Sequence, residues 1–256
     1  MEIAGKIAVV TGAAGGIGAA LAESLAATGA AHVVCVDRDA GVQAIADKVG
    51  GSAHIVDVTD PARLTGMIDA VEADIGPIAL FCSNAGILIP GGVEVPDDDW
   101  QRIWTVNVMS HVWAARHLVP LMAARGGGYL LNTASAAGLL NQVGSAPYGV
   151  TKHAAVGLAE WLAMTYGDLG IGVSVLCPQA VRSAMTAGIE DHVAGIDGML
   201  EPQVVADACL EAIRTERFMV LPHPQVAGYL RTKAADYDRW IGGMRKLNRR
   251  FGKIGT

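Results

Sequence analysis

The amino-acid sequence predicts an α/β fold, a doubly wound parallel sheet of about seven strands with helices on both faces. Two observations predict this class, and a third predicts the number of domains. Short runs rich in Val and Ile alternate along the chain with longer segments of helical composition. The apolar runs are continuous rather than interrupted by polar residues, which is typical of parallel strands buried on both faces. No repeat, low-complexity tract or Pro/Ser-rich linker divides the 256 residues, so residues 1–256 are expected to form a single domain.

The predicted elements follow one another in βαβ order up to residue 221. Asp60-Pro61 is typical of a helix start, because Asp caps the first turn and Pro is tolerated at the first helical position. Asp97–Asp99 place negative charge at another helix N-terminus, where the helix dipole favours it. The expected strands are Ile7–Val10, Val33–Val36, His54–Val56, Ile78–Cys82, Tyr129–Thr133, Val173–Leu176 and Phe218–Leu221. The expected helices are Gly16–Thr28, Ala40–Val49, Pro61–Asp74, a helix through Trp100 to Ala124, Pro147–Leu169 and Pro202–Arg214.

Composition and charge exclude several classes of protein. Hydrophobic residues make up 52% of the chain and charged residues 17%, which predicts a large core rather than disorder. The net charge of −6 argues against general nucleic-acid binding. No export signal or membrane-spanning segment is evident, so a cytoplasmic location without a membrane partner is expected. The four cysteines form no CxxC pair and the seven His show no ligand spacing, so reduced, buried cysteines and no metal site are expected.

The Gly-rich segment Thr11–Gly18 lies between the first predicted strand and the first predicted helix. Glycines at 12, 16 and 18 allow a tight turn and leave backbone N–H groups open to a pyrophosphate at the helix N-terminus. Asp37 ends the second strand, 19 residues after Gly18, where a carboxylate accepts hydrogen bonds from a ribose and repels a 2′-phosphate. The pattern predicts an NAD site. Helix–strand packing for the glycines, and loop capping for Asp37, are the structural alternatives.

Tyr148 and Lys152 stand four residues apart on the helix predicted from residue 147, so both side chains lie on one face. An ordinary phenol is a poor base at neutral pH, and a nearby cation is expected to lower its pKa. Ser135 follows a predicted strand, 13 residues before Tyr148, and its hydroxyl is placed to hold a substrate oxygen. Residues 126–151 contain no charged side chain, so Lys152 would act on its neighbour unscreened.

The sequence motifs are TGxxxGxG at residues 11–18, Asn84-Ala85-Gly86, Ser135, and YxxxK at residues 148–152. The order and spacing of these motifs resemble those of the short-chain dehydrogenase/reductase family. The resemblance covers about residues 5–221 and implies a Rossmann-like sheet. It also implies the catalytic tetrad Asn107, Ser135, Tyr148 and Lys152, with Asn107 holding a water in a proton relay. The cofactor residues that it implies are Gly12, Gly16, Ile17, Gly18, Asp37, Asp57, Val58, Asn84, Ala85, Gly86, Tyr148, Lys152, Pro178, Val181 and Ser183.

The resemblance implies an NAD(H)-dependent oxidoreductase that interconverts a secondary alcohol and a ketone, with Tyr148 as general acid and base. The expected pocket walls are 87–89, 136–142 and 184–200, mainly apolar with Asn141, Gln142, Glu190, Asp191 and His192 as exceptions. A neutral apolar substrate is therefore expected. Gln179 departs from the family, which usually has Gly there, and it either contacts substrate or points away. The alternatives are an NADPH-dependent 3-oxoacyl-thioester reductase and a non-catalytic cofactor-binding sensor.

Residues 224–256 are expected to form a C-terminal amphipathic helical extension. Apolar residues there recur every three or four positions, at Leu230, Ala234, Tyr237, Ile241, Met244, Leu247 and Phe251. Residues 231–256 hold eight Lys/Arg and two Asp, a local charge of +6, which leaves −12 elsewhere. Gly242-Gly243 is expected to weaken the helix and is a candidate break point. Three roles are open for this extension: it covers the core of its own subunit, it closes the substrate pocket, or it packs on a neighbouring subunit. A homo-oligomer is expected, a tetramer rather than a dimer, with no nucleic-acid partner.

Overall fold

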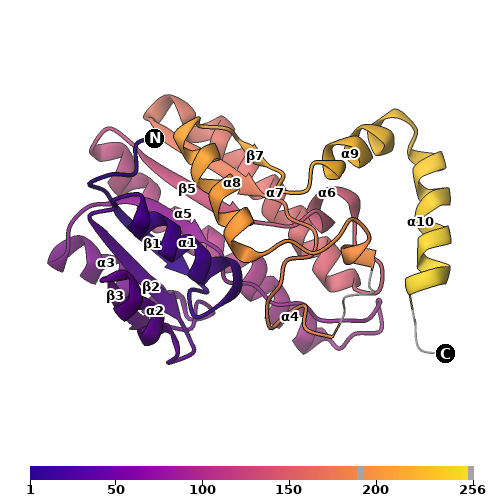
Figure 1. Cartoon of the computed structure of the whole chain (residues 1–256), viewed down its shortest axis with the longest axis horizontal. Helices are drawn as coiled ribbons and strands as arrows, with labels where there is room; N and C mark the ends of the chain where they lie inside the picture. Colours follow the sequence, from indigo (N-terminus) through magenta and orange to yellow (C-terminus); the bar gives the residue numbers. More distant parts are fainter. Residues whose placement is uncertain (189–192, 253–256) are drawn as a thin grey trace.

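A computed structural model of the chain describes residues 1–188 and 193–252. The strands of the described residues form one seven-stranded, all-parallel sheet in the order β3-β2-β1-β4-β5-β6-β7 (Figure 1). The predicted doubly wound α/β class is confirmed. The strands are β1 (Ile7–Thr11), β2 (His32–Asp37), β3 (Ser52–Ile55), β4 (Ile78–Ser83), β5 (Gly128–Thr133), β6 (Ile171–Leu176) and β7 (Met219–Val220).

Helices cover both faces of the sheet, and alternate strand residues point to opposite faces. Val9 belongs to the core under the helices at 61–74, 110–124 and 146–166, whereas its neighbours Ala8 and Val10 belong to the core under the helices at 16–27, 42–49 and 202–214. The four cysteines are buried in these two cores. The helices are α1 (Gly16–Ala27), α2 (Val42–Val49), α3 (Pro61–Asp74), α4 (Asp97–Trp104), α5 (Ser110–Ala124), α6 (Ala137–Leu140), α7 (Ala146–Tyr166), α8 (Pro202–Arg214), α9 (Gln225–Ala235) and α10 (Tyr237–Phe251).

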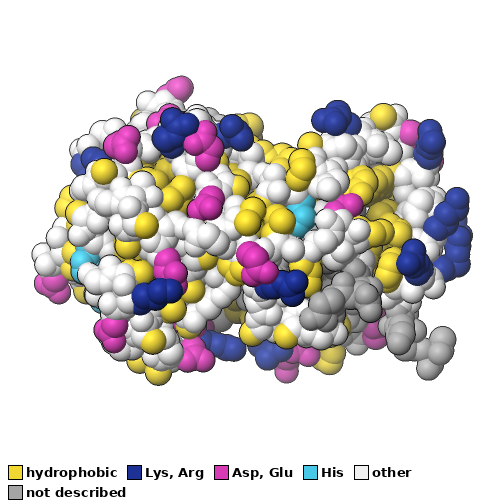
Figure 2. Space-filling model, in the orientation of Figure 1, with side chains coloured by type: hydrophobic (Ala, Val, Ile, Leu, Met, Phe, Trp, Pro, Cys, Tyr) yellow, Lys and Arg dark blue, Asp and Glu magenta, His cyan; other side chains and the backbone are white. Residues whose placement is uncertain are grey.

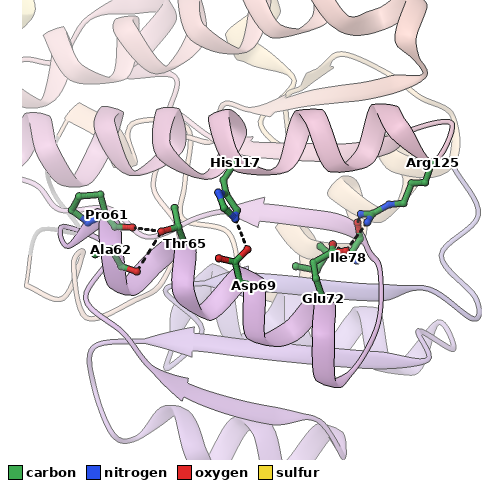
Figure 3. Close-up of polar contacts among 8 residues, drawn as sticks. All are labelled: Pro61, Ala62, Thr65, Asp69, Glu72, Ile78, His117 and Arg125. Carbon is green, nitrogen blue, oxygen red and sulfur yellow. Dashed lines mark hydrogen bonds and ion pairs between the residues drawn. The ribbon is translucent and has the colours of Figure 1, made fainter.

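A hydrogen bond and an ion pair hold α3 against α5 and the residue that follows it at the protein surface (Figure 3). His117 Nε2 lies 2.6 Å from Asp69 Oδ1, and Arg125 donates to Glu72 Oε2 at 2.7 Å. The Arg125 guanidinium also donates to the carbonyl of Ile78, where β4 begins. Within the described residues, no helix combines the length and apolar content that crossing a bilayer requires.

Several element boundaries differ from the predicted ones. The third strand begins at Ser52 rather than His54, because its pairing with β2 starts at Val34–Ser52. The second helix begins at Val42 rather than Ala40, because the Asp39 carboxylate accepts from the N–H of Gly41 and holds a turn there. The long helix predicted through Trp100 to Ala124 is divided by a π-helical turn, Thr105–Met109. Residues 167–169 form a 3₁₀ turn after α7 rather than its last turn.

The C-terminal extension consists of two helices that meet at Asp236, so the predicted break at Gly242-Gly243 is wrong. The Asp236 carboxylate caps α10 by accepting from the N–H of Arg239 at 2.9 Å. The helix then continues through both glycines to Phe251. Helix α9 is fastened to α6, where Lys233 Nζ donates to the carbonyl of Leu139 at 2.5 Å. Helix α10 stands at the edge of the molecule, connected through α9 (Figure 1).

Candidate active site

The glycine turn after β1 requires the absence of side chains. Gly12 and Gly16 have φ of +70° and +54°, which L side chains rarely adopt. A Cβ at Gly12 would lie 2.9 Å from Ala85 Cα, and a Cβ at Gly18 would lie 2.0 Å from the carbonyl oxygen of Gly12. The turn thus packs closely against the loop after β4. Gly18 allows this packing because its missing side chain leaves room for the carbonyl of Gly12 and the side chain of Asn84.

A first cavity of about 420 Å³ opens above the turn, at the carboxyl ends of the strands. It brings together all the residues expected to contact the cofactor except Gly18. Asp37 and Asp57 line one end, and Arg38 lies beside them. The Asp37 carboxylate also has the loop-capping role considered from sequence, since it accepts from the N–H groups of Ala14 and Asp39, each at 3.0 Å.

Asn84 ties three neighbouring strand ends together behind the cavity. Its Nδ2 donates to the carbonyl of Thr11 at 3.0 Å, and its Oδ1 accepts from Thr133 Oγ1 at 3.1 Å. The Thr11 hydroxyl in turn accepts from the N–H groups of Asn84 and Ala85. These bonds join β1, β4 and β5, which fixes the floor on which the remaining site residues sit.

Tyr148 and Lys152 project from α7 toward Ser135, which lies in the loop after β5. Lys152 is 3% exposed, its Nζ donates to the carbonyl of Thr133 at 2.9 Å, and it lies 5.6 Å from the centroid of the Tyr148 ring. The Ser135 hydroxyl accepts from the N–H of Ala137 at 3.1 Å. The structure therefore brings the predicted hydroxyl, phenol and ammonium groups to one place.

The pKa of the phenol differs from the expectation drawn from sequence. Burial raises the pKa of Tyr148 and outweighs the hydrogen bond with Ser135, which lowers it, so the net decrease expected from sequence is replaced by a net increase. Burial also lowers the pKa of Lys152 to about 8. The reason is desolvation, which disfavours the charged form of both groups and which the YxxxK spacing does not reveal.

Asn107 lies in the π-helical turn between α4 and α5 and is fully buried. Its Oδ1 accepts from the N–H of Ile87 at 2.9 Å, and its Nδ2 donates to the carbonyl of Ile87 at 3.0 Å and to Thr151 Oγ1 at 3.2 Å. A Cβ at Gly86 would lie 3.4 Å from both Asn107 Oδ1 and Lys152 Nζ. The two polar atoms therefore face a common point that the glycine leaves open. Single π-helical turns within an α-helix, such as this one, occur frequently at functional sites.

Two buried histidines behind the site were not recognised from sequence. His111 on α5 lies 3.2 Å from Asn132 Oδ1 through its Nδ1, and burial together with the charge of Lys152 lowers its pKa to about 3. His223, after β7, accepts from the N–H of Gln179 at 3.2 Å. Neither position carries a motif, and only the tertiary packing identifies them. The described residues contain no group of three His, Cys, Asp or Glu side chains suited to a metal ion.

A second cavity of about 710 Å³ meets the first at Ser135 and Tyr148. Gln179 lines both cavities, and its buried Oε1 has no hydrogen-bond partner among the described residues. Predicted wall residues at 88, 136–137, 140–142 and 185–186 are present, whereas Glu190, Asp191 and His192 lie outside the described residues. The C-terminal extension forms the far wall of this cavity, which is one of the three roles considered for it from sequence. The residues of this wall are Tyr229, Thr232, Arg239, Trp240, Gly243, Met244 and Leu247.

Comparison with known proteins identifies the family. Residues 6–194 match the family model described as short chain dehydrogenase. The chain is 34% identical over 251 residues to 1-deoxy-11-beta-hydroxypentalenate dehydrogenase of Streptomyces exfoliatus, covering 94% of this chain and 91% of that protein. It is 32% identical over 194 residues to 3-oxoacyl-[acyl-carrier-protein] reductase of Escherichia coli (strain K12), covering 75% and 80%.

Solved structures give the same result. A short chain dehydrogenase/reductase from Burkholderia phymatum in complex with NAD superposes with a TM-score of 0.83 at 30% identity, over 93% of this chain and 96% of that one. A 7 alpha-hydroxysteroid dehydrogenase complexed with NADH and 7-oxo glycochenodeoxycholic acid superposes with a TM-score of 0.77 at 28% identity, over 86% and 92%. Motifs, strand order and comparisons agree that the chain belongs to the short-chain dehydrogenase/reductase family, as an oxidoreductase that acts on alcohols or ketones with a nicotinamide cofactor.

Proposed function

We propose that this protein is an NAD(H)-dependent oxidoreductase that interconverts a bulky apolar secondary alcohol and its ketone, with Tyr148 as general acid and base. One observation carries the proposal. The phenol of Tyr148 and the hydroxyl of Ser135 stand where a glycine-lined cavity meets a larger, mainly apolar one. A reacting carbon at this junction reaches both the proton-transfer group and whatever the first cavity holds.

The first cavity fits a dinucleotide. Backbone N–H groups of the glycine turn lie at the start of α1, where a Cβ at Gly15 would meet nothing within 4 Å. The Asp37 carboxylate lies beside this turn, where it accepts from the N–H of Ala14 at 3.0 Å, and there it favours ribose hydroxyls over a 2′-phosphate and supports NAD over NADP. When bound, the nicotinamide supplies the acceptor or donor of the hydride.

In the oxidative direction the Tyr148 phenolate accepts the proton of the substrate hydroxyl, while Ser135 holds the same oxygen. The Lys152 ammonium, 5.6 Å from the centroid of the ring, stabilises the negative charge on the phenolate. We place a water molecule at the open point beside Gly86, between Lys152 Nζ and Asn107 Oδ1. This water accepts the proton that leaves the active site past Lys152. The amide of Asn107 keeps one acceptor lone pair for this water beyond its bond to Ile87.

A screen of secondary alcohols and ketones with NAD(H) and NADP(H) tests the proposal. We expect turnover of bulky apolar substrates and a higher kcat/KM with NAD. The Asp37→Ala variant should lose that preference, and it should also lose some stability because the N–H of Ala14 loses its acceptor. A clear preference of the unaltered protein for NADP, or no turnover of any secondary alcohol or ketone, would contradict the proposal.

A second candidate function is reduction of 3-oxoacyl thioesters with NADPH, which the similarity to the Escherichia coli reductase favours. Asp37 in the first cavity argues against this function, whereas Arg38, which lines the cavity beside it, is suited to a 2′-phosphate. Including an acetoacetyl thioester with NADPH in the screen separates the two functions.

We infer that the protein forms a homo-oligomer, a tetramer rather than a dimer. Large apolar side chains are exposed on one side of α7, where Met164 is 77% exposed and Trp161 50% exposed. Tyr237 and Ile241 on α10 are also more than half exposed. Contiguous exposed apolar side chains of this kind mark protein–protein contacts.

A further inference from the structure

Among the described residues that line the second cavity, one is charged, and that residue is Arg239. The rest of this wall is aliphatic, aromatic, small or neutral polar. Arg239 is exposed, so water solvates its charge at the edge of the cavity, and among the described lining residues it is the only one whose charge can pair with an anion bound there.

The orientation of α10 explains why this Arg and not its neighbours faces the cavity. Trp240, Gly243, Met244 and Leu247 line the cavity and stand at i, i+3, i+4 and i+7, one helical face. Arg239 borders that face, whereas Arg245 and Arg249 lie on the opposite side of the helix and do not line the cavity. Figure 2 shows hydrophobic side chains on the side of α10 toward the body of the molecule, and Lys and Arg gathered on its outer side.

The Arg239 guanidinium has no acidic partner within the described residues. By contrast, Arg182 is paired with Glu201 at 2.6 Å and Arg125 with Glu72 at 2.7 Å. A guanidinium presents its donors in a planar fork that matches a carboxylate with two parallel hydrogen bonds. Beside a cavity with low-dielectric walls, that interaction is stronger than at an open surface.

Arg239 and the reacting groups lie on different walls of the cavity. Ser135 follows β5 and Tyr148 begins α7, whereas Arg239 lies in the first turn of α10, which Figure 1 shows set apart from α6 and α7. A cavity of about 710 Å³ accommodates a ligand large enough to touch both walls.

We propose that the substrate carries one oxyanionic group, a carboxylate above all, at the end remote from the reacting carbon, and that Arg239 binds it and determines specificity. This inference rests on the proposed function and names its substrate class: a bulky apolar hydroxy or oxo acid. It replaces the neutral substrate expected from sequence, because the sequence did not show that α10 brings Arg239 to the cavity.

Two fluorescent probes test the anion site without turnover. 1-Anilinonaphthalene-8-sulfonate and N-phenyl-1-naphthylamine share one aromatic skeleton, and only the first carries an oxyanion. In about 0.15 M salt we expect Arg239→Gln to weaken binding of the anionic probe about tenfold to hundredfold and to leave the neutral probe unchanged. Arg239→Lys should keep part of the affinity. The matched control Arg245→Gln, with the same charge change on the outer side of α10, should alter neither Kd.

Three results would overturn the inference. They are an unchanged Kd for the anionic probe in Arg239→Gln, an equal loss in Arg245→Gln, and an equal loss for the neutral probe. An equal loss in Arg245→Gln would show that the change in affinity comes from net charge. An equal loss for the neutral probe would show that the substitution disturbs the cavity wall that α10 forms. Folding is not at risk, since the Arg239 side chain is exposed.

A kinetic experiment adds bulky apolar oxo acids and their methyl esters to the screen. Arg239→Gln should raise KM about tenfold or more for each acid, with little change in kcat, and should leave the ester unchanged. If no alcohol or ketone is turned over, the proposed function fails while the probe titrations still decide whether the anion site exists. If esters and acids respond alike to the substitution, the anion site fails while the oxidoreductase function stands.

Discussion

At the scale of single residues, the neutral form of both Tyr148 and Lys152 is favoured by burial. The pKa of the phenol is raised, and the pKa of the ammonium is lowered to about 8. Proton removal from an alcohol requires the phenolate, so the Ser135 hydroxyl and the nearby ammonium must together oppose the desolvation of that anion. Formation of the phenolate thus depends on the positions of Ser135 and Lys152, because the Tyr148 phenol is not acidic by itself.

Tyr148→Phe isolates the proton-transfer role. The ring remains and only the hydroxyl is lost, so we expect turnover to fall about 10²- to 10⁴-fold while NADH affinity changes little. Steady-state kinetics and NADH fluorescence titration measure the two quantities. Tyr166→Phe is the matched control, because Tyr166 ends the same helix outside both cavities. A Tyr148→Phe enzyme with near-normal kcat would rule out the proposed mechanism.

His111 makes stability depend on acid. Its pKa is about 3 in the folded protein against about 6.5 when exposed. The unfolded chain therefore takes up a proton first as the pH falls. The associated stability is fully present above about pH 6.5 and is lost progressively between pH 6.5 and pH 3.

At pH 4.5 this linkage amounts to about 3 kcal/mol of lost unfolding free energy. We expect His111→Gln, measured by urea unfolding at pH 7 and pH 4.5, to lose less stability between the two pH values than the unaltered protein. Carboxylates titrate in both proteins, so the difference between the two losses is the relevant quantity. Equal losses in the two proteins would show that His111 does not govern this response.

At the scale of elements, α10 is a helix held mainly at its first turn. None of its described residues is fully buried, and Trp240, near its start, packs partly buried against the core. The Asp236 cap satisfies an N–H of the same turn that would otherwise lack a partner. Since Arg239 is the residue whose N–H is capped, the order of this turn also sets the position of the proposed anion site.

Asp236→Ala should therefore loosen α10 selectively. Loss of a cap costs about 1 kcal/mol, which corresponds to about fivefold faster amide exchange in this helix and a higher KM for oxo acids. Hydrogen exchange followed by mass spectrometry measures the first effect. Asp60→Ala, which removes the cap of α3, is the control and should accelerate exchange in α3 while leaving α10 unchanged. Uniform acceleration in both variants would contradict local control by the cap.

The elements also show which features a sequence can predict. Helices α3 and α8 begin at Pro61 and Pro202 as predicted, because the signal for a helix start is local. The third strand was misplaced because its bounds depend on pairing with β2. Ser135, Tyr148 and Lys152 were predicted together because strand ends and a helical repeat fix their spacing. The pKa shifts and the placement of Arg239 were not, since burial and the α9–α10 joint are tertiary properties.

At the scale of the whole molecule, the C-terminal extension is expected to bury apolar surface between subunits as well as to form a wall of the substrate cavity. Truncation after Pro224 should reduce the oligomer, measured by light scattering, and raise KM. It also removes Val226, which is buried in the core. Truncation after Ala235 removes α10 alone and separates the two effects. An unchanged oligomer and an unchanged KM in both truncations would show that the extension is neither an arm nor a wall.

The burial of all four cysteines has a practical consequence for the whole molecule. Desolvation raises the pKa of Cys35 to about 11 and those of Cys82 and Cys177 to about 12, and that of Cys209 lies well above its ordinary value. The thiolate is the nucleophile that attacks alkylating reagents, so burial and a raised pKa protect all four sulfurs in the native fold. Labelling therefore requires the cores on the two faces of the sheet to open, and the rate of labelling measures the rate of that opening. Inactivation by iodoacetamide would then report loss of structure rather than modification of a catalytic thiol.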